Sequence, residues 1–289
     1  MRVAAVLATV LALAAGLGAA TAPLSGKKVL VLLPSESFLR LQHGRLVRVG
    51  SYLDEVVVPS MALAAAGAAL TFATPQGNKP VVDPRSNASS YFANASEYAA
   101  ALRFWDAVVA AGPTRQVREW TAEDPAAPWD ACGAGTGACA AAAFDAVFVP
   151  GGHAPMVDLW PSTAVGRILV QFARAKKPIV AICHGPVVLA AASLLTDVPT
   201  WPFRGSNLTV FSQAAEEVVE AKYWGGDKLG YYPPQILAAL GAAMVEGPHF
   251  ESHVVLSVTV HGGPVLTGQN PASAPALGAA FVRLLAGEP

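Results

Sequence analysis

The stretch KPIVAICHGPVVLAAASLL (177–195) decides how this chain folds. Its apolar run 177–182 predicts a buried parallel strand, and the apolar run from Pro186 to about Leu195 predicts a helix. Almost no loop separates the two, so Cys183 at the junction is expected in a tight, strained turn with its side chain pointing out of the sheet. Gly185 leaves room for a close backbone crossing there. The stretch therefore predicts a nucleophile elbow in an α/β fold.

The position of Cys183 also predicts a reactive thiol with a lowered pKa. The positive end of the following helix and the neighbouring His184 both favour the thiolate form. The alternative is a buried small hydrophobe, which is what free cysteines usually are. The tight turn and the adjacent histidine favour the nucleophile.

Segments on both sides of the elbow repeat the strand and helix order of a parallel sheet. On the N-terminal side, 27–34 and 69–74 are predicted strands that enclose a helix over 53–66, in which Pro59 predicts a kink or a later start. After the elbow, the pattern predicts strands over 208–212, 253–260 and 264–268, and helices over 214–221, 233–242 and about 272–285; before it, a strand over 144–150 and a helix over about 162–175.

Residues 75–143 interrupt this rhythm. They hold Pro and Asn clusters, three tryptophans and the Gly-rich loop GAGTGA between Cys132 and Cys139. We interpret the segment as an insertion or cap over the sheet within one domain that spans 21–289.

The N-terminus predicts export. Residues 1–20 read as a secretory signal peptide, with one basic residue, a short apolar core and small residues before a cleavage point after Ala20. An uncleaved membrane anchor is the alternative, but the apolar run is short and rich in Ala and Gly. The expected location is the secretory pathway or the extracellular space.

Two further features agree with export. Sequons at Asn87, Asn94 and Asn207 predict glycosylation, which would make the chain a glycoprotein. Cys132 and Cys139 predict a small-loop disulfide in an oxidising compartment, the alternative being two unpaired cysteines in a flexible loop.

Composition narrows the classes of partner. The 19 Lys and Arg against 20 Asp and Glu form no basic patch or acidic tail, so no nucleic-acid partner is expected. No stretch beyond the N-terminus has the ~18 uninterrupted apolar residues of a membrane span, so no membrane contact is expected after signal cleavage.

A second glycine-containing turn follows the strand at 144–150. Gly151 and Gly152 present bare backbone N–H groups that can face a developing oxyanion. Ligand sites in open α/β sheets lie at the carboxyl ends of the strands, so this turn and Cys183 should converge. His153 next to it is expected in the pocket wall.

Several stretches together resemble the ThiJ/PfpI superfamily, which has a class I glutamine-amidotransferase-like fold. They are SYLDEVVVPSMALAAAGAALTFATPQG (51–77), FDAVFVPGGHAPMVDL (144–159), AICHGPVVLAAA (181–192), TVFSQAAEE (209–217) and VLTGQNPASAPALGAAFVRLL (265–285). The strings Cys-His-Gly-Pro and Thr-Gly-Gln-Asn-Pro are similar to the branch of heat-shock chaperones and glutathione-independent glyoxalases, also called glyoxalase III or D-lactate dehydratase. The resemblance implies a flavodoxin-like parallel sheet sandwiched by helices.

The resemblance also implies roles at matching positions. Cys183 matches the nucleophile, His184 its partner, and Glu216 the acid of a Cys-His-Glu arrangement, with the adjacent Glu217 left as an alternative. Glu55 matches an acidic residue that approaches the cysteine from the first helix, and it is expected to be protonated beside a sulfur anion. The backbone of Gly152 and the N–H of His184 match the oxyanion site. Plainer readings remain: the glutamates as solvated helix residues, and His184 as the cap of a turn.

The leading functional expectation is a glyoxalase that needs no cofactor, glutathione or metal and converts methylglyoxal or a similar 2-oxoaldehyde to a 2-hydroxy acid. The alternatives are a stress-protective chaperone or redox-sensing protein, and a cysteine hydrolase or peptidase. A small sealed pocket over Cys183 would favour the aldehyde enzyme, an open groove the peptidase, and a broad apolar surface the chaperone. His249 and His253 are four residues apart but border a strand, which argues against a metal pair. A homodimer is left open.

Overall fold

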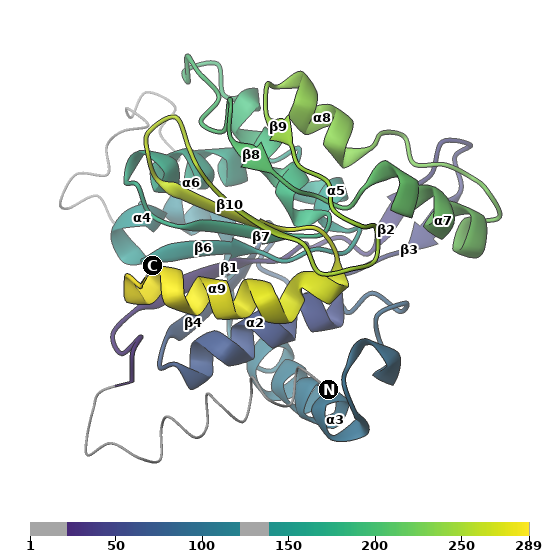
Figure 1. Cartoon of the computed structure of the whole chain (residues 1–289), viewed down its shortest axis with the longest axis horizontal. Coiled ribbons are helices and arrows are strands. Elements are labelled where there is room, and N and C mark those ends of the chain that lie inside the picture. Colours follow the sequence, from purple (N-terminus) through teal and green to yellow (C-terminus); the bar gives the residue numbers. More distant parts are fainter. Residues whose placement is uncertain (1–21, 122–138, 289) are drawn as a thin grey trace.

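A seven-stranded sheet forms the centre of the molecule, which is described here from a computed structural model over residues 22–121 and 139–288. The strand order is β10-β11-β7-β6-β1-β4-β5, and every neighbouring pair is parallel except β10 with β11 (Figure 1). Their bounds are β1 Lys28–Leu32, β4 Ala69–Thr74, β5 Thr114–Gln116, β6 Ala146–Val149, β7 Ile179–Ile182, β10 Val254–Val258 and β11 Pro264–Gly268. The predicted α/β class with a largely parallel sheet is confirmed.

Helices cover both faces of this sheet (Figure 1). One layer holds α2 (Leu53–Ala65), α3 (Ala95–Phe104) and α9 (Ala274–Ala286), with α2 packed against α9. The other layer holds α4 (Ala140–Ala143), α5 (Pro155–Asp158), α6 (Thr163–Arg174), the 3₁₀ helix η4 (Gly185–Leu194) and α8 (Pro233–Ala239), with α6 packed against η4.

Successive side chains along each strand point to opposite faces of the sheet, so the hydrophobic core has two parts. Val147 and Ile179 face the layer of α6 and η4, whereas Phe148 and Val180 face the layer of α2 and α9. All four side chains are fully buried. Strands buried on both faces explain why their sequences are continuous apolar runs.

Two predicted elements differ from the structure. The expected helix at 186–195 is the 3₁₀ helix η4, and the expected strand at 208–212 is reduced to β8 (Asn207–Leu208), which pairs with β9 (Ala243–Met244). Beyond Leu208 the chain crosses the strand ends, where Phe211 N–H donates to the carbonyl of Cys183 at 2.9 Å. Because this segment crosses the ends of several strands, it cannot continue the pairing of β8 with β9. The hairpin of β2 (Phe38–Arg40) and β3 (Leu46–Arg48) was not predicted.

The segment 75–143 supplies an edge strand as well as helices. β5 pairs with β4, and α3 continues into the π-helix η2 (Trp105–Ala110); the short 3₁₀ helices η1 (Ser89–Tyr91) and η3 (Val117–Trp120) flank them. Cys132 and the predicted leader lie outside the described residues, so the disulfide and the signal peptide stay predictions. The asparagines of all three sequons are exposed. No helix in the described ranges is long and apolar enough to cross a membrane.

Candidate active site

Cys183 occupies the tight turn that the sequence predicts. It is one of two non-glycine residues in the described chain with positive φ, at 59°. Its N–H donates to Gly268 O, and its carbonyl accepts from Phe211, both at 2.9 Å. A Cβ on Gly185 would overlap the carbonyl of Val149, so only glycine fits after the elbow. Such backbone strain costs about 1–3 kcal/mol and persists because the surrounding contacts fix it.

A chain of side chains leads away from the sulfur. Cys183 Sγ lies 3.2 Å from His184 Nδ1, and His184 Nε2 lies 2.6 Å from Glu216 Oε2. Glu216 projects from the first turn of α7 (Gln213–Trp224), whose start is fixed by the Ser212 hydroxyl accepting from Ala215 N–H. The structure thus brings together the three residues expected to form a Cys-His-Glu arrangement.

The choice between the two adjacent glutamates is clear in the structure. Glu216 is buried at 1% exposure against His184, whereas Glu217 is exposed and accepts from the Gln213 side chain at 3.0 Å. Glu216 therefore takes the acid position, and Glu217 serves below as a matched control.

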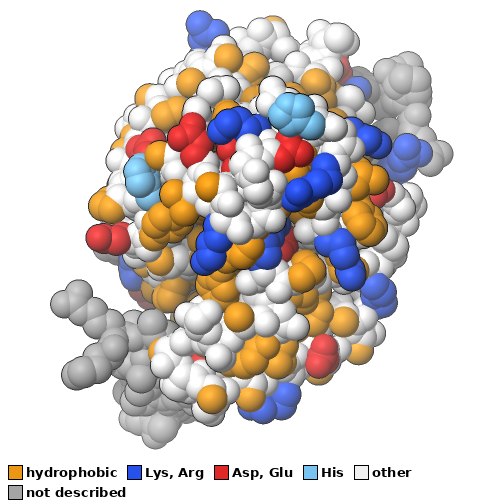
Figure 2. All heavy atoms as spheres, turned by 90° about the vertical axis from the view of Figure 1, so that its right-hand side faces the viewer, with side chains coloured by type: hydrophobic (Ala, Val, Ile, Leu, Met, Phe, Trp, Pro, Cys, Tyr) orange, Lys and Arg blue, Asp and Glu red, His pale blue; other side chains and the backbone are white. Residues whose placement is uncertain are grey.

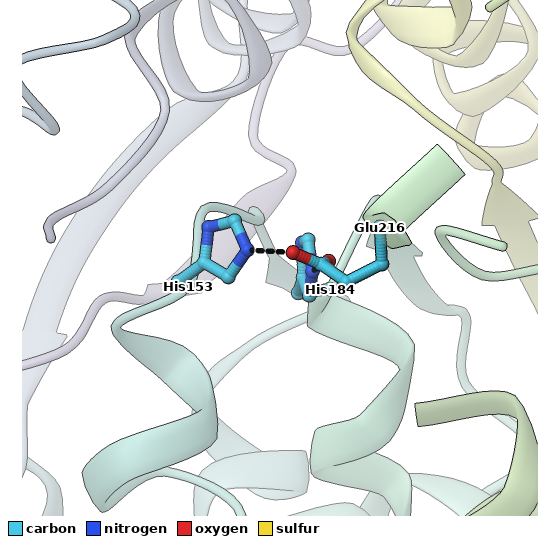
Figure 3. Close-up of side chains that lie close together, drawn as sticks. All are labelled: His153, His184 and Glu216. Atoms are coloured by element: carbon cyan, nitrogen blue, oxygen red, sulfur yellow. Dashed lines mark hydrogen bonds and ion pairs between the residues drawn. The ribbon is translucent and has the colours of Figure 1, made fainter. Parts of the chain in front are cut away.

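His153 binds the other oxygen of Glu216 (Figure 3). Arg85 Nη2 lies 3.1 Å from His153 Nδ1. Because a guanidinium can only donate, Nδ1 must accept, and the proton of the neutral ring sits on Nε2. That Nε2–H donates to Glu216 Oε1 at 2.8 Å. Burial lowers the pKa of His153 to about 4, which keeps the ring neutral at physiological pH.

These contacts also assign where the protons lie on the hydrogen-bonded side chains of the site. Although burial acts to raise it, the nearby His153 and His184 hold the pKa of Glu216 well below its ordinary value. An ionised Glu216 accepts from both rings, so His184 carries its proton on Nε2. The lone pair on His184 Nδ1 then faces Cys183 Sγ. This arrangement can accept the thiol proton during nucleophilic attack.

Glu55 approaches Cys183 from the start of α2. Its side chain is fully buried, and its carboxyl oxygens have no hydrogen-bond partner of good geometry among the described residues. Burial, helped by the neighbouring Asp54, raises the pKa of Glu55 well above its ordinary value, in the predicted direction. The thiol of Cys183 and the backbone of Gly151 both act on this carboxyl in the opposite sense, lowering its pKa.

The predicted lowering of the Cys183 pKa is wrong. Burial raises the pKa of the thiol well above its ordinary value, and the charge of Glu55 raises it further, although the Gly152 N–H acts in the opposite sense. Two like charges cannot both form cheaply in this enclosed space, so Cys183 and Glu55 ionise in turn. The thiol must therefore lose its proton to a neighbouring base as it attacks.

Both glycines of the second turn are required by close contacts. Gly152 has φ of +90°, and a Cβ there would overlap the carbonyl of Gly50. Its N–H acts to lower the pKa of Cys183, which is the effect expected of an oxyanion donor beside the sulfur. A Cβ on Gly151 would overlap Glu55 Oε2 and lie 2.6 Å from Cys183 Cβ. The turn thus lets Glu55, Cys183 and the donor approach one another.

Gly151→Ala should destabilise the protein by about 1–3 kcal/mol and reduce turnover, because the added methyl overpacks the contact between Glu55 and Cys183. Urea unfolding with an activity assay measures both. Gly230→Ala is the matched control, since a Cβ there meets nothing within 4 Å, and it should stay within ~0.5 kcal/mol. Equal behaviour of the two variants would contradict the proposed crowding.

A small cavity lies over this group of residues. It offers about 40 Å³ to the centres of water-sized molecules, where one water needs roughly 10–15 Å³. The cavity therefore admits a ligand of only a few non-hydrogen atoms. Its lining residues are Tyr52, Arg85, Gly152, His153, Cys183, His184, Phe211, Val219, Tyr223 and Pro271. Only Arg85 comes from the segment 75–143 that was interpreted as a cap, and α7 supplies two of the other residues.

The same residues are the candidates for metal binding. His153, His184 and Glu216 form the one group of three within the described chain whose donor atoms, all within 4.8 Å of one another, could hold an ion. Their hydrogen bonds already use both glutamate oxygens, so an ion would displace the proton that joins Glu216 to His184. His249 lies elsewhere, where its Nδ1 is 3.1 Å from the Ser212 hydroxyl.

The sequence analysis missed two residues of the site and assigned a third too small a role. Asp83 and Arg85 lie in a loop without periodicity, and nothing local marks them as partners of the site. His153 was expected only in the wall, yet it anchors Glu216. The Gly-Gly-His turn was the available signal, but its contact depends on where α7 places the glutamate.

Comparison with known proteins identifies the family of this chain. Residues 47–284 match the model of the DJ-1/PfpI family. Protein/nucleic acid deglycase HchA of Pseudomonas aeruginosa (strain UCBPP-PA14) is 27% identical over 191 residues, which are 66% of this chain and 59% of that protein. Glutathione-independent glyoxalase hsp3102 of Schizosaccharomyces pombe is 30% identical over 148 residues, 49% and 58% of the respective chains. The matches thus span less than two thirds of either relative.

A solved structure shares the fold. Glyoxalase III from Candida albicans superposes with a TM-score of 0.65 at 18% identity, and the match covers 89% of this chain and 96% of that chain. At that identity the likeness concerns the fold alone. The family match covers most of the sequence, including the elbow and the glycine turn. This chain belongs to the DJ-1/PfpI family.

Proposed function

We propose that this protein is a cofactor-free glyoxalase that converts a small 2-oxoaldehyde, such as methylglyoxal, to a 2-hydroxy acid through Cys183. The cavity carries the proposal. It is small, holds a ligand of a few non-hydrogen atoms, and contains a cysteine, a proton acceptor and an oxyanion donor. Methylglyoxal has five non-hydrogen atoms, whereas a peptide would need an open groove.

The first half of the reaction uses the cysteine as nucleophile. Cys183 attacks the aldehyde carbon while its proton passes to His184 Nδ1, the acceptor that lies 3.2 Å from the sulfur. The resulting hemithioacetal oxygen faces the N–H groups of Gly152 and His184, which stabilise the developing charge. Glu216 holds His184 in the tautomer that accepts the proton.

The second half moves a proton and releases product. A base removes the proton on the aldehyde carbon to give an enediol, and a proton is returned to the adjacent carbon. Glu55 and His184 are the groups placed to carry it. This leaves a thioester of the 2-hydroxy acid on Cys183, which water cleaves to free acid and thiol. The net change is addition of one water to the 2-oxoaldehyde, and no electron acceptor is consumed.

HchA is a relative described as a protein/nucleic acid deglycase, which suggests a related activity, removal of sugar-derived groups from protein or nucleic acid. A glycated side chain would have to bring its adduct to Cys183 through the same small cavity. The free aldehyde fits with less rearrangement. A glycated lysine peptide offered in place of methylglyoxal separates the two activities.

One observation favours the chaperone alternative. Leu256, Val258 and Val260 form an exposed apolar row on and just after the edge strand β10, and the first two are 60% and 59% exposed. On the face drawn in Figure 2, however, hydrophobic side chains are interspersed with Lys, Arg, Asp and Glu. Suppression of aggregation that survives Cys183→Ala would support the chaperone.

The proposal is tested by incubating the purified protein with methylglyoxal in glutathione-free buffer and measuring lactate. We expect lactate in proportion to protein concentration, with no requirement for glutathione. A protein whose Cys183 titrates fully with a thiol reagent but that forms no lactate would refute the proposal for this substrate. Regeneration of the free lysine amine in the glycated peptide, with no lactate formed from methylglyoxal, would favour the deglycase.

A further inference from the structure

Arg85 is the fixed charge in the cavity wall. Its Nε donates to Asp83 Oδ1 at 2.9 Å, and its Nη2 donates to Asp83 Oδ2 at 2.6 Å. The same Nη2 supplies the 3.1 Å contact with His153 Nδ1, and the guanidinium carbon lies 5.3 Å above the ring of Trp224. The guanidinium is thus held by a carboxylate, a histidine and an aromatic face.

The other terminal nitrogen of the Arg85 guanidinium, Nη1, has no hydrogen-bond partner among the described residues. Nη1 is shielded from solvent and makes no hydrogen bond within the described part of the chain. A guanidinium has five N–H donors, of which the contacts above use three. Leaving buried donors unpaired is unfavourable, so such a donor is usually satisfied by an ordered water, an ion or a ligand. Arg85 lines the same cavity as Cys183 and Gly152.

We propose that Arg85 Nη1 binds the oxygen on the carbon adjacent to the aldehyde, so that Arg85 is the residue that selects 2-oxoaldehydes over simple aldehydes. This inference rests on the proposed function and names the substrate feature that the site recognises. When the hemithioacetal loses the proton on its sulfur-bearing carbon, the electron pair moves to that oxygen. Arg85 then faces an enediolate. A proton passes from the oxygen on the sulfur-bearing carbon to the oxygen at Arg85, and protonation of the adjacent carbon then leaves the thioester carbonyl and a neutral hydroxyl.

The charges around the cavity favour an uncharged dicarbonyl over a keto acid. Asp83 already neutralises Arg85, Glu216 is ionised, and Cys183 with Glu55 carries further negative charge once either ionises. A substrate carboxylate would meet these like charges among buried side chains. A neutral carbonyl oxygen needs only a donor, which Nη1 supplies.

The test compares two ligands on the unmodified protein and on Arg85→Met. Acetohydroxamic acid carries two adjacent oxygens and resembles the enediolate, whereas propanal reacts with a thiol but lacks the second oxygen. Binding of each is measured as protection of Cys183 from a thiol reagent, which does not depend on turnover. In Arg85→Met we expect acetohydroxamate to bind about 10- to 100-fold more weakly, the usual range for a charge-assisted hydrogen bond, and propanal to change by less than about twofold.

Two further variants keep the test decisive. Arg85→Lys retains the charge beside Asp83 but lacks Nη1, so it should show the same selective loss. It serves as the test variant if Arg85→Met folds poorly. Arg103→Met removes an exposed arginine of α3 and should alter neither ligand. Equal weakening of both ligands would show that Arg85 only supports the fold of the site, and no weakening would show that it does not touch the ligand; either overturns the inference.

The result is separable from the proposed function. Lactate formation without a selective loss in the Arg85 variants would remove Arg85 and leave the glyoxalase. A selective loss without lactate formation by the unmodified protein would keep the recognition site and remove methylglyoxal turnover.

Discussion

Cys183→Ala should reduce lactate formation from methylglyoxal by a factor on the order of 10⁴ or more, because only binding and oxyanion contacts remain when a nucleophile is removed. The fold should persist. The side chain is 3% exposed, the change removes one atom, and the strained turn is held by the backbone hydrogen bonds to Gly268 and Phe211. Lactate quantification and thermal unfolding measure the two effects.

Cys183→Ser sharpens this prediction. It keeps the size and a hydrogen-bond donor, but a hydroxyl is far less acidic than a thiol, so turnover should fall nearly as far. If either folded variant forms lactate at more than a few per cent of the normal rate, a thiol nucleophile is excluded, and an acid–base mechanism on the free aldehyde would have to replace it.

Glu55→Gln should reduce turnover by ~10²–10⁴, the usual worth of a general acid–base, while keeping size and a donor. Reactivity of the thiol should change in the opposite direction. The charge of Glu55 raises the pKa of Cys183, so its removal should move the midpoint of thiol labelling to lower pH. Faster labelling together with slower turnover would distinguish a proton shuttle from a residue that merely activates the sulfur.

The matched control for this change is Glu217→Gln. It makes the same substitution on an exposed helix residue and should leave turnover and labelling unchanged. A folded Glu55→Gln protein that turns over methylglyoxal at the normal rate would remove Glu55 from the mechanism. His184 and Glu216 would then be the remaining candidates for proton transfer.

The sequence predicted the elements whose pattern is local. The run 177–182 followed directly by a helical segment was sufficient for the elbow, and the φ of Cys183 confirms the strained turn. The helix type after it was not predictable. Gly166 of α6 lies so close to Ala191 that a Cβ there would overlap its carbonyl, so tertiary packing acts on that segment directly. The local preference of a sequence for an α-helix over a 3₁₀ helix is weak compared with such packing contacts.

Features that depend on distant segments were predicted less well. The lowered thiol pKa followed from the helix end and His184, but the structure adds burial and the charge of Glu55, which outweigh them. The tie between Arg85 and His153 spans 68 residues along the chain and has no local signal. The hairpin at 38–48 carried no clear pattern either, since the exposed neighbours of Leu39 and Val47 include the apolar Phe38 and Leu46.

The most direct test of the account is intact-protein mass spectrometry of a rapid-quench reaction between the protein and methylglyoxal. The account predicts a transient mass increase of one methylglyoxal, mapped to Cys183, that disappears as lactate appears. Because the hemithioacetal reverses in acid, the species that survives quenching should be the thioester of the 2-hydroxy acid. Lactate formed at the normal rate with no adduct on Cys183 at any time, and the same rate in Cys183→Ala, would contradict it.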